Sequence, residues 1–188
     1  MVIEAAVEHI VIAQDELKRR VSELGAEITD HYAGERGGGE LAVITILKGG
    51  FIFLADLIRH IDYPLTVDFM AISGYEAMGR DSGVVKITKD LTDSIYGRRV
   101  IIVEDIIDTG LTLSYIVKNL LSRSPRDLRI CTLLDRRARR IAELDIDFVG
   151  FEIGDIFVAG YGLDFRQRYR NLSFICTIKR ELLEAESL

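Results

Sequence analysis

The chain has 188 residues, of which 48% are hydrophobic and 29% charged, with 16 glycines, 2 prolines and a formal net charge of −6. A chain of this length buries roughly 70% of the surface that its unfolded form exposes, so we predict one globular domain over residues 1–188. The acidic balance opposes nonspecific attraction to polyanions and anionic lipids, and we expect no nucleic-acid partner and no membrane partner.

The cysteines and the N-terminal segment bear on the compartment. Cys131 and Cys176 lie in apolar runs and form no C-x-x-C pair, which indicates neither a disulfide framework nor a zinc site. Apolar stretches such as 49–57 are much shorter than the roughly 18 residues that a membrane-spanning helix needs. Glu4 and Glu8 stand where a secretory signal carries positive charge. We therefore expect a cytoplasmic protein.

The first part of the chain alternates helical and strand-like patterns. Apolar residues recur at steps of four and three within 14–32, which predicts an amphipathic helix that covers a sheet. The uninterrupted apolar run 41–47 predicts a strand buried on both faces. Residues 51–61 predict a helix that ends before Pro64, and residues 65–72 predict the next strand.

The rest of the chain continues this alternation. The polar segment 73–83 has three glycines and no packing face, which is typical of a mobile loop. One further helix is predicted over 111–121. Further strands are predicted over 84–88, 99–103, 128–134, 148–153 and 173–179. Strands that alternate with helices indicate an α/β fold with a mainly parallel central sheet flanked by helices.

Several common catalytic signatures are absent from the sequence. It contains no Walker A loop, no G-x-S-x-G elbow, no H-E-x-x-H pair and no dinucleotide fingerprint. The three histidines, His9, His31 and His60, lack the spacing of metal ligands, and we interpret them as exposed or capping residues. The familiar nucleotide-hydrolase, esterase and zinc-protease functions therefore lose support.

The most informative segment is 100–113, where an apolar strand leads through a polar turn into a helix. Ligands of open α/β sheets bind at such a place, beyond the carboxyl end of a strand. Thr109, Gly110 and Thr112 offer hydroxyls and free amides at a helix N-terminus, which favours a phosphate group. The alternative is a turn in which Asp108 and Thr109 only cap the helix.

Two carboxylates, Glu104 and Asp105, come directly before this turn. Carboxylates suit hydrogen bonding to vicinal sugar hydroxyls or indirect binding of Mg²⁺. A phosphate site beside a site for hydroxyls and a cation predicts a phosphorylated sugar as the ligand. The alternative interpretation is a solvated acidic pair, and we favour the ligand site because the polar residues cluster directly after a buried strand.

Four separated segments of the chain match the pattern of one family. They are Leu47-Lys48-Gly49-Gly50, the loop 73–83, Val103-Glu104-Asp105-Ile106-Ile107-Asp108-Thr109-Gly110, and the stretch 149–164 followed by 169–172. From about residue 7 to 178 the chain resembles the type I phosphoribosyltransferases, and within them most closely the bacterial hypoxanthine-guanine enzymes. The resemblance implies the type I fold with a small hood, formed by the N-terminal segment and roughly 150–180.

The resemblance also implies an activity. Members of this family transfer 5-phosphoribosyl from phosphoribosyl pyrophosphate to a base with the help of Mg²⁺, and the closest branch uses the 6-oxopurines hypoxanthine and guanine in purine salvage. A homodimer or homotetramer is implied as well. Two alternatives stay open, namely a phosphoribosyltransferase for another base such as xanthine, and a regulator that senses phosphoribosyl pyrophosphate.

The resemblance assigns roles to residues around the central motif. Asp108 matches the acidic residue that acts on the imidazole nitrogen of the purine as general base or as electrostatic partner. A non-proline cis peptide is implied between Leu47 and Lys48. Metal-binding positions are Asp164, Glu104 and Asp105. Positions for the phosphoribosyl and diphosphate groups are Lys48, Gly49, Glu104, Asp105, Thr109, Gly110, Leu111, Thr112 and Arg170.

Further positions concern the base and the exclusion of water. Phe157 matches an aromatic residue that stacks on the purine, and Val158 matches one whose backbone reads the purine edge. Ser73 and Tyr75 lie in the loop that matches a lid, which would keep water from an oxocarbenium-like sugar. Without the resemblance, the position of Phe157 predicts an ordinary core residue.

Arg136 departs from the family pattern, in which a lysine at this position donates to the 6-oxo group of the purine. Arginine also donates, but its planar fork is longer and has a different geometry, so the base preference is open. Arg136 belongs to a basic run with Arg137, Arg139 and Arg140. We expect Arg136 in the site and the other three arginines outside it, on a solvated face or a subunit contact.

Overall fold

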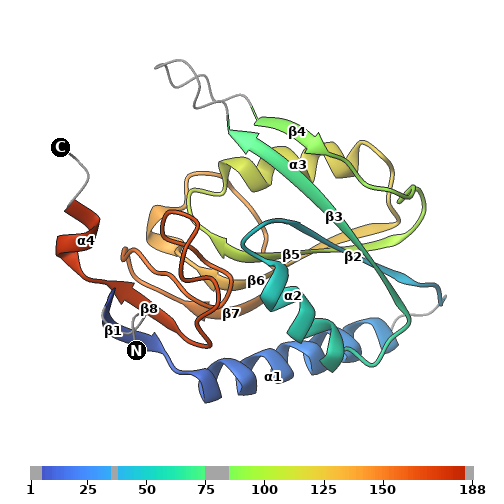
Figure 1. The fold of residues 1–188 in the computed structure, drawn as a ribbon. Coiled ribbons are helices and arrows are strands. Elements are labelled where there is room, and N and C mark those ends of the chain that lie inside the picture. Colours follow the sequence, from blue (N-terminus) through green and yellow to red (C-terminus); the bar gives the residue numbers. More distant parts are fainter. Residues whose placement is uncertain (1–5, 35–37, 75–84, 185–188) are drawn as a thin grey trace.

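A six-stranded sheet with strand order β4-β3-β2-β5-β6-β7 forms the centre of the computed structural model, which describes residues 6–34, 38–74 and 85–184 (Figure 1). A second sheet pairs β1 with β8. The strands are β1 (Val7–Ile12), β2 (Leu41–Leu47), β3 (Leu65–Gly74), β4 (Val85–Lys89), β5 (Arg99–Ile107), β6 (Asp127–Asp135), β7 (Phe148–Glu152) and β8 (Ile175–Ile178). The helices are α1 (Gln14–Ala33), α2 (Phe51–Leu57), α3 (Leu111–Leu121) and α4 (Arg180–Glu184), with short 3-10 helices η2 (Ile58–His60) and η3 (Arg137–Arg139).

The order in which the chain adds strands to the sheet reverses between β2 and β5, although the two strands are parallel. β2 is parallel to both β3 and β5, β5 is parallel to β6, and β6 is parallel to β7, whereas β4 is antiparallel to β3. The chain runs outward from β2 to β3, and after β4 it returns to β5 and continues outward to β6. Open α/β sheets bind ligands beyond the carboxyl ends of the two strands at such a reversal. The mainly parallel sheet predicted from the sequence is confirmed.

Both faces of the sheet are buried, because side chains of β2 and β5 alternate between two hydrophobic cores. Leu41 and Val43 pack with residues of α1 and α2, whereas Ala42 and Ile44 pack with residues of α3 on the opposite face. Figure 1 shows the corresponding layers, with α3 across the sheet from α1 and α2. This double burial explains why the strand 41–47 reads as an uninterrupted apolar run.

The element boundaries agree with the sequence prediction except at a few ends. The helix expected over 51–61 is α-helical only to Leu57 and continues as the 3-10 helix η2. The strand expected to end at Val103 continues to Ile107, because its ladder with β6 extends to the pair of Ile107 and Asp135. The loop expected to begin at Ser73 begins later, because Ser73 and Gly74 belong to β3 and pair with β4. Tyr75 and the rest of the expected loop up to residue 83 lie outside the described residues.

The strand β1 was not predicted from the sequence. It pairs antiparallel with β8, so two segments from opposite ends of the chain lie side by side (Figure 1). A small separate core of Ala159, Leu172, Cys176 and Ile178 lies beside this pair. Cys131 and Cys176 are free and buried. No helix in the described part of the chain is both long and apolar enough to cross a membrane.

Gly25 allows α1 to pack closely against the 3-10 helix η2. A Cβ atom at Gly25 would lie 2.4 Å from the His60 Cβ and 2.7 Å from the His60 backbone oxygen. We expect Gly25→Ala to lower the free energy of unfolding by about 1–3 kcal/mol, because overpacking outweighs the roughly 1 kcal/mol that alanine gains in a helix. Urea denaturation checks this, with Gly154→Ala as control, since a Cβ at Gly154 meets nothing within 4 Å. Equal or greater stability of Gly25→Ala would contradict the prediction.

Candidate active site

The turn between β5 and α3 lies at the sheet reversal and depends on Gly110. Gly110 has φ +76°, in the left-handed region, and immediately precedes the first residue of α3. A Cβ at this glycine would lie 3.0 Å from both the Arg140 Cδ and the Leu144 Cδ1. Glycine is therefore required both by the backbone conformation and by the close packing of the turn.

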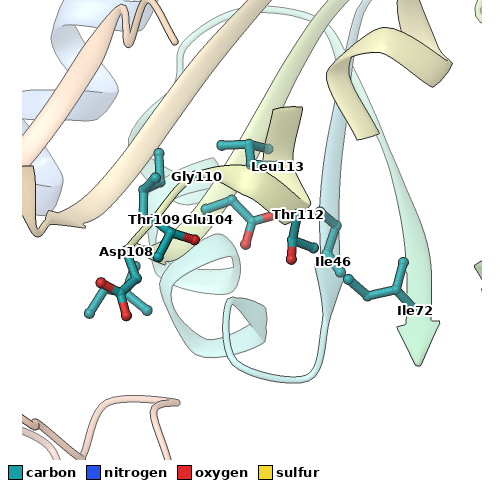
Figure 2. A pocket seen from close by; sticks show the side chains of 10 residues that line it. Ile46, Ile72, Glu104, Asp108, Thr109, Gly110, Thr112 and Leu113 are labelled. Carbon is teal, nitrogen blue, oxygen red and sulfur yellow. The ribbon is translucent and has the colours of Figure 1, made fainter. Parts of the chain in front are cut away.

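A first pocket surrounds this turn, and we call it the turn pocket (Figure 2). Its polar lining is Glu104, Asp108, Thr109, Gly110 and Thr112, and its apolar lining is Ile46, Ile72, Ile106, Ile107 and Leu113. The lining therefore joins two threonine hydroxyls to the amino end of α3, where backbone N–H groups have no helical acceptor. Hydroxyls and amides at the positive end of a helix suit an anionic ligand, and phosphate in particular.

Glu104 places a carboxylate in the turn pocket, where Figure 2 shows it together with Thr112. Its Oε1 is buried and accepts no hydrogen bond from any residue that the structure describes. Burial raises the pKa of Glu104 well above its usual value, and the neighbouring charge of Asp105 raises it further. A buried acceptor without a partner calls for a donor or cation from a ligand, and sugar hydroxyls or a divalent cation fit that need.

A second pocket lies on the other side of the end of β5, and we call it the cleft pocket. Its lining is Lys48, Gly49, Asp105, Ile106, Asp108, Arg136, Arg139, Phe157, Val158, Leu163, Asp164 and Arg170. The sequence predicted Glu104 and Asp105 together beside the turn, but Glu104 lines the turn pocket and Asp105 lines the cleft pocket. The reason is that both residues lie within β5, where successive side chains point to opposite faces.

The segment after β2 approaches Asp105 so closely that only glycine fits. A Cβ at Gly49 would lie 1.7 Å from the Asp105 Oδ2. The peptide bond between Leu47 and Lys48 is cis, as the family resemblance implies. Burial raises the pKa of Asp105 to about 6, against the lowering effect of backbone hydrogen bonds. The ends of β2 and β5 therefore form one continuous wall of the cleft pocket.

A network of charged and polar side chains joins Lys48, beside the end of β2, to Arg170 and Asp164. Arg170 Nη2 lies 2.7 Å from Asp164 Oδ1, and Arg170 Nη1 donates to the Gly162 carbonyl at 2.7 Å. Gln167 Oε1 accepts from Lys48 Nζ at 3.3 Å and from Arg170 Nη2 at 3.2 Å. Sequence reasoning missed Gln167, because a polar residue in an irregular segment gives no signal of its own. This network offers the cations Lys48 and Arg170 and the Asp164 carboxylate to a ligand.

Asp108 lies at the boundary of the two pockets and lines both. Its Oδ2 lies 3.3 Å from Arg136 Nη1 and 3.4 Å from Arg139 Nη1. Its Oδ1 is buried and has no hydrogen-bond partner among the residues that the structure describes. One carboxylate oxygen is thus held by guanidinium groups, while the other is buried without a hydrogen-bond partner among the described residues.

Aromatic surface is available in the cleft pocket beside these arginines. Phe157 is 47% exposed and meets the ring of Phe165 edge to face, with 5.8 Å between centroids. Val158 next to it is buried. Arg136 is 7% exposed, and its Nη2 donates to the Ile156 carbonyl. Phe157 is therefore not the core residue that its sequence position alone suggests, and its exposed ring can receive a planar ligand.

Four residues differ in their surroundings from what the sequence predicts. Arg139 lines the cleft pocket with Arg136, whereas we expected it outside the site. Arg140 is half-buried, pairs with Asp135 and donates from Nε to the Asp108 carbonyl at 3.3 Å, so it supports the turn. The Leu111 side chain is 56% exposed and, like Ser73, is not in the described lining of either pocket.

The described residues, 6–34, 38–74 and 85–184, contain no group of three His, Cys, Asp or Glu side chains that could hold a metal ion by itself. Mg²⁺ commonly binds through one or two carboxylates, waters and the phosphates of a substrate. Asp105 and Asp164 line the same pocket and fit that mode. The acidic residues therefore suit a cation that arrives with a phosphorylated ligand.

Comparison with known proteins identifies the family of this chain. A model described as phosphoribosyl transferase domain matches residues 12–166. The chain belongs to the phosphoribosyltransferase family. It is 48% identical to the hypoxanthine-guanine phosphoribosyltransferase of Bacillus subtilis over 179 residues, which are 95% of this chain and 97% of that protein. Similarity to a Salmonella typhimurium hypoxanthine phosphoribosyltransferase is 46% identity over 166 residues, 88% of this chain and 92% of that one.

Solved structures give the same result for this phosphoribosyltransferase. A hypoxanthine phosphoribosyltransferase from Staphylococcus aureus has a TM-score of 0.90 and 41% identity, and the match covers 97% of each chain. The family and the fold class expected from the sequence are confirmed. Enzymes of this family are generally dependent on Mg²⁺.

The buried Glu104 of this phosphoribosyltransferase is expected to cost stability in metal-free solution. Because the pKa of Glu104 is raised, the folded protein binds this proton more tightly than the unfolded chain does. The contribution of Glu104 to stability therefore falls as pH rises from the carboxyl pKa of the unfolded chain toward the raised pKa of the folded protein. We expect Glu104→Gln to raise the free energy of unfolding by roughly 1 kcal/mol at about pH 7.5 and to have little effect at about pH 4. Denaturation in the presence of a chelator measures this. The exposed Glu143→Gln is the control, and a gain that does not depend on pH would contradict the assignment.

Proposed function

We propose that the protein transfers the 5-phosphoribosyl group from phosphoribosyl pyrophosphate to a 6-oxopurine, hypoxanthine or guanine, and releases diphosphate. The observation that carries this proposal is the pair of pockets that share Asp108. A reaction between a phosphorylated sugar and a flat base needs two adjoining sites and a group at their junction. The names of the similar enzymes from Bacillus subtilis and Salmonella typhimurium support the same substrates.

In this proposal the turn pocket receives the phosphorylated sugar. The amides of Gly110 and Leu111 and the hydroxyls of Thr109 and Thr112 bind the 5-phosphate, because they lie at the amino end of α3. The unpartnered Glu104 carboxylate accepts hydrogen bonds from the ribose hydroxyls. Both interactions are present before and during reaction, so they position the sugar carbon that is attacked.

The cleft pocket receives the diphosphate and the metal. Lys48, Gly49 and Arg170 bind the diphosphate, with arginine suited to a bidentate hold on phosphate oxygens. Asp105 and Asp164 are the proposed ligands of Mg²⁺, and Glu104 contributes from the neighbouring turn pocket through water or a ribose hydroxyl. When bound, Mg²⁺ neutralises charge on the departing diphosphate.

The base lies between Phe157 and the end of β5. Phe157 stacks on the purine, the backbone of Val158 contacts its edge, and Arg136 donates to its 6-oxo group. A ring nitrogen attacks the anomeric carbon, and the carbon–oxygen bond to the diphosphate breaks with the electron pair leaving on oxygen. The proton of the purine imidazole passes to Asp108 or stays hydrogen-bonded to it.

The proposal also includes a lid over the site and an assembly of identical subunits. The family resemblance assigns Ser73 and Tyr75 to a lid, which would exclude water from the cationic sugar. Ser73 is exposed at the end of β3, whereas Tyr75 lies outside the described residues. The protein assembles as a homodimer or homotetramer, in line with the family resemblance.

The activity is tested with phosphoribosyl pyrophosphate, Mg²⁺ and each of hypoxanthine, guanine, xanthine, adenine and uracil, monitored by ultraviolet absorbance. We expect nucleotide formation with hypoxanthine and guanine, because Arg136 is a hydrogen-bond donor toward a 6-oxo group and repels a 6-amino group. A preference for xanthine would revise the base assignment. Binding of phosphoribosyl pyrophosphate without turnover of any base would favour the sensor instead.

Replacing Asp108 tests its role at the junction. Asp108→Asn keeps the size of the side chain but removes the proton acceptor, so we expect kcat to fall by roughly 10²–10⁴-fold. Steady-state kinetics with hypoxanthine measures this, and thermal unfolding verifies that the variant folds. Asp145→Asn, at an exposed position outside both pockets, is the control. An unchanged kcat would leave Asp108 only its ion pairs with Arg136 and Arg139.

A further inference from the structure

Arg139 contacts two carboxylates, Asp108 in the lining of the cleft pocket and Asp155 outside that lining. It lies at the end of the 3-10 helix η3, with its side chain 47% exposed. Its Nη1 is 3.4 Å from Asp108 Oδ2, and its Nε is 3.6 Å from Asp155 Oδ1. Asp108 follows β5, whereas Asp155 directly precedes the segment that carries Phe157. The guanidinium group therefore bridges the junction carboxylate and the aromatic segment.

Arg136 makes a parallel bridge between the same two regions. Its Nη1 contacts Asp108 Oδ2 at 3.3 Å, and its Nη2 donates to the Ile156 carbonyl. The two arginines begin and end one 3-10 turn, in which the Arg139 amide donates to the Arg136 carbonyl at 3.0 Å. Arg136 is almost fully buried, and Arg139 holds the same carboxylate oxygen from the mouth of the pocket. Together they fix Asp108 from two directions.

The consequence for Asp108 is a defined orientation. Two guanidinium groups contact Oδ2, and the Arg140 Nε contacts the backbone oxygen of Asp108 at 3.3 Å. The remaining oxygen, Oδ1, is buried and accepts no hydrogen bond from the described part of the chain. Rotation of the carboxylate would give up both guanidinium contacts. The contacts to Oδ2 and to the backbone oxygen thus fix the rotamer of the Asp108 carboxylate.

We infer that Arg139 is a positioning residue, which fixes the Asp108 carboxylate relative to the purine-binding segment through its bridge to Asp155. This inference rests on the proposed function. Arginine is required because its planar fork reaches both carboxylates at once, whereas the single ammonium group of lysine reaches one of them. Since both ion pairs are largely exposed, they add little to folding stability, and their effect falls on the reaction.

The first test compares kinetics of three variants with hypoxanthine and phosphoribosyl pyrophosphate. We expect Arg139→Gln to lower kcat about tenfold, with the KM for phosphoribosyl pyrophosphate and the melting temperature nearly unchanged. Arg139→Lys restores part of kcat, because it keeps one ion pair. Asp155→Asn lowers kcat in the same direction but less. A loss of kcat without a change in that KM separates positioning from general damage to the site.

Arg137→Gln is the matched control. Arg137 is exposed on the same 3-10 turn and carries the same charge, but it is not in the described lining of either pocket. We expect its kinetics to equal those of the wild type. If Arg139→Gln behaves like Arg137→Gln, or if Arg139→Lys is no better than Arg139→Gln, the inference is overturned.

Crystal structures of the wild type, Arg139→Gln and Arg137→Gln provide a readout that does not depend on activity. We expect the Asp108 carboxylate to adopt a second rotamer only in Arg139→Gln. If the wild type forms no nucleotide from any purine, the proposed function fails, and these structures alone decide the inference. An unchanged Asp108 rotamer in Arg139→Gln would then overturn the positioning role as well.

Discussion

The alternation of side chains at the end of β5 is the constraint on which the site depends. Because the ladder with β6 continues to Ile107, Glu104 and Asp105 are consecutive strand residues that face opposite sides. Glu104 lines the turn pocket, and Asp105 lines the cleft pocket against Gly49. A strand that ended at Val103 would leave both carboxylates in an irregular turn with no fixed separation. The length of one strand thus divides one acidic pair between two binding sites.

The second constraint is the position of β5 beside β2 at the sheet reversal. Parallel pairing brings the carboxyl ends of both strands to the same edge, so the 47–50 segment and the β5–α3 turn meet although about sixty residues separate them in sequence. Gly49 permits backbone contact with Asp105, and Gly110 permits the left-handed turn before α3. A side chain at Gly49 would displace the Asp105 carboxylate, and one at Gly110 would strain the turn, so the shape of the site rests on backbone geometry as much as on charged groups.

The central motif could be predicted from the sequence because its signal is local. An apolar strand, a polar turn and a helix occur within 100–113, and the phosphate-binding residues are adjacent in the chain. The strand β1 gave no such signal, since its stability comes from pairing with β8 about 165 residues away and half of its residues are exposed. The end of β5 was also missed, because Glu104 and Asp105 are unfavourable strand residues in isolation and only the ladder with β6 retains them.

The arginines in and beside η3 show that the role of a basic run depends on where each side chain lies in the fold. In an acidic protein with a net charge of −6, a basic run is most simply interpreted as a solvated face. The 3-10 turn instead directs Arg136 and Arg139 toward Asp108, and Arg140 toward Asp135 and the Asp108 backbone. Period-based reasoning fails here because a 3-10 turn of three residues has no helical face to predict. The local positive charge also offsets the repulsion that the surrounding carboxylates would exert on an anionic substrate, which an acidic chain can bind only where cations are gathered.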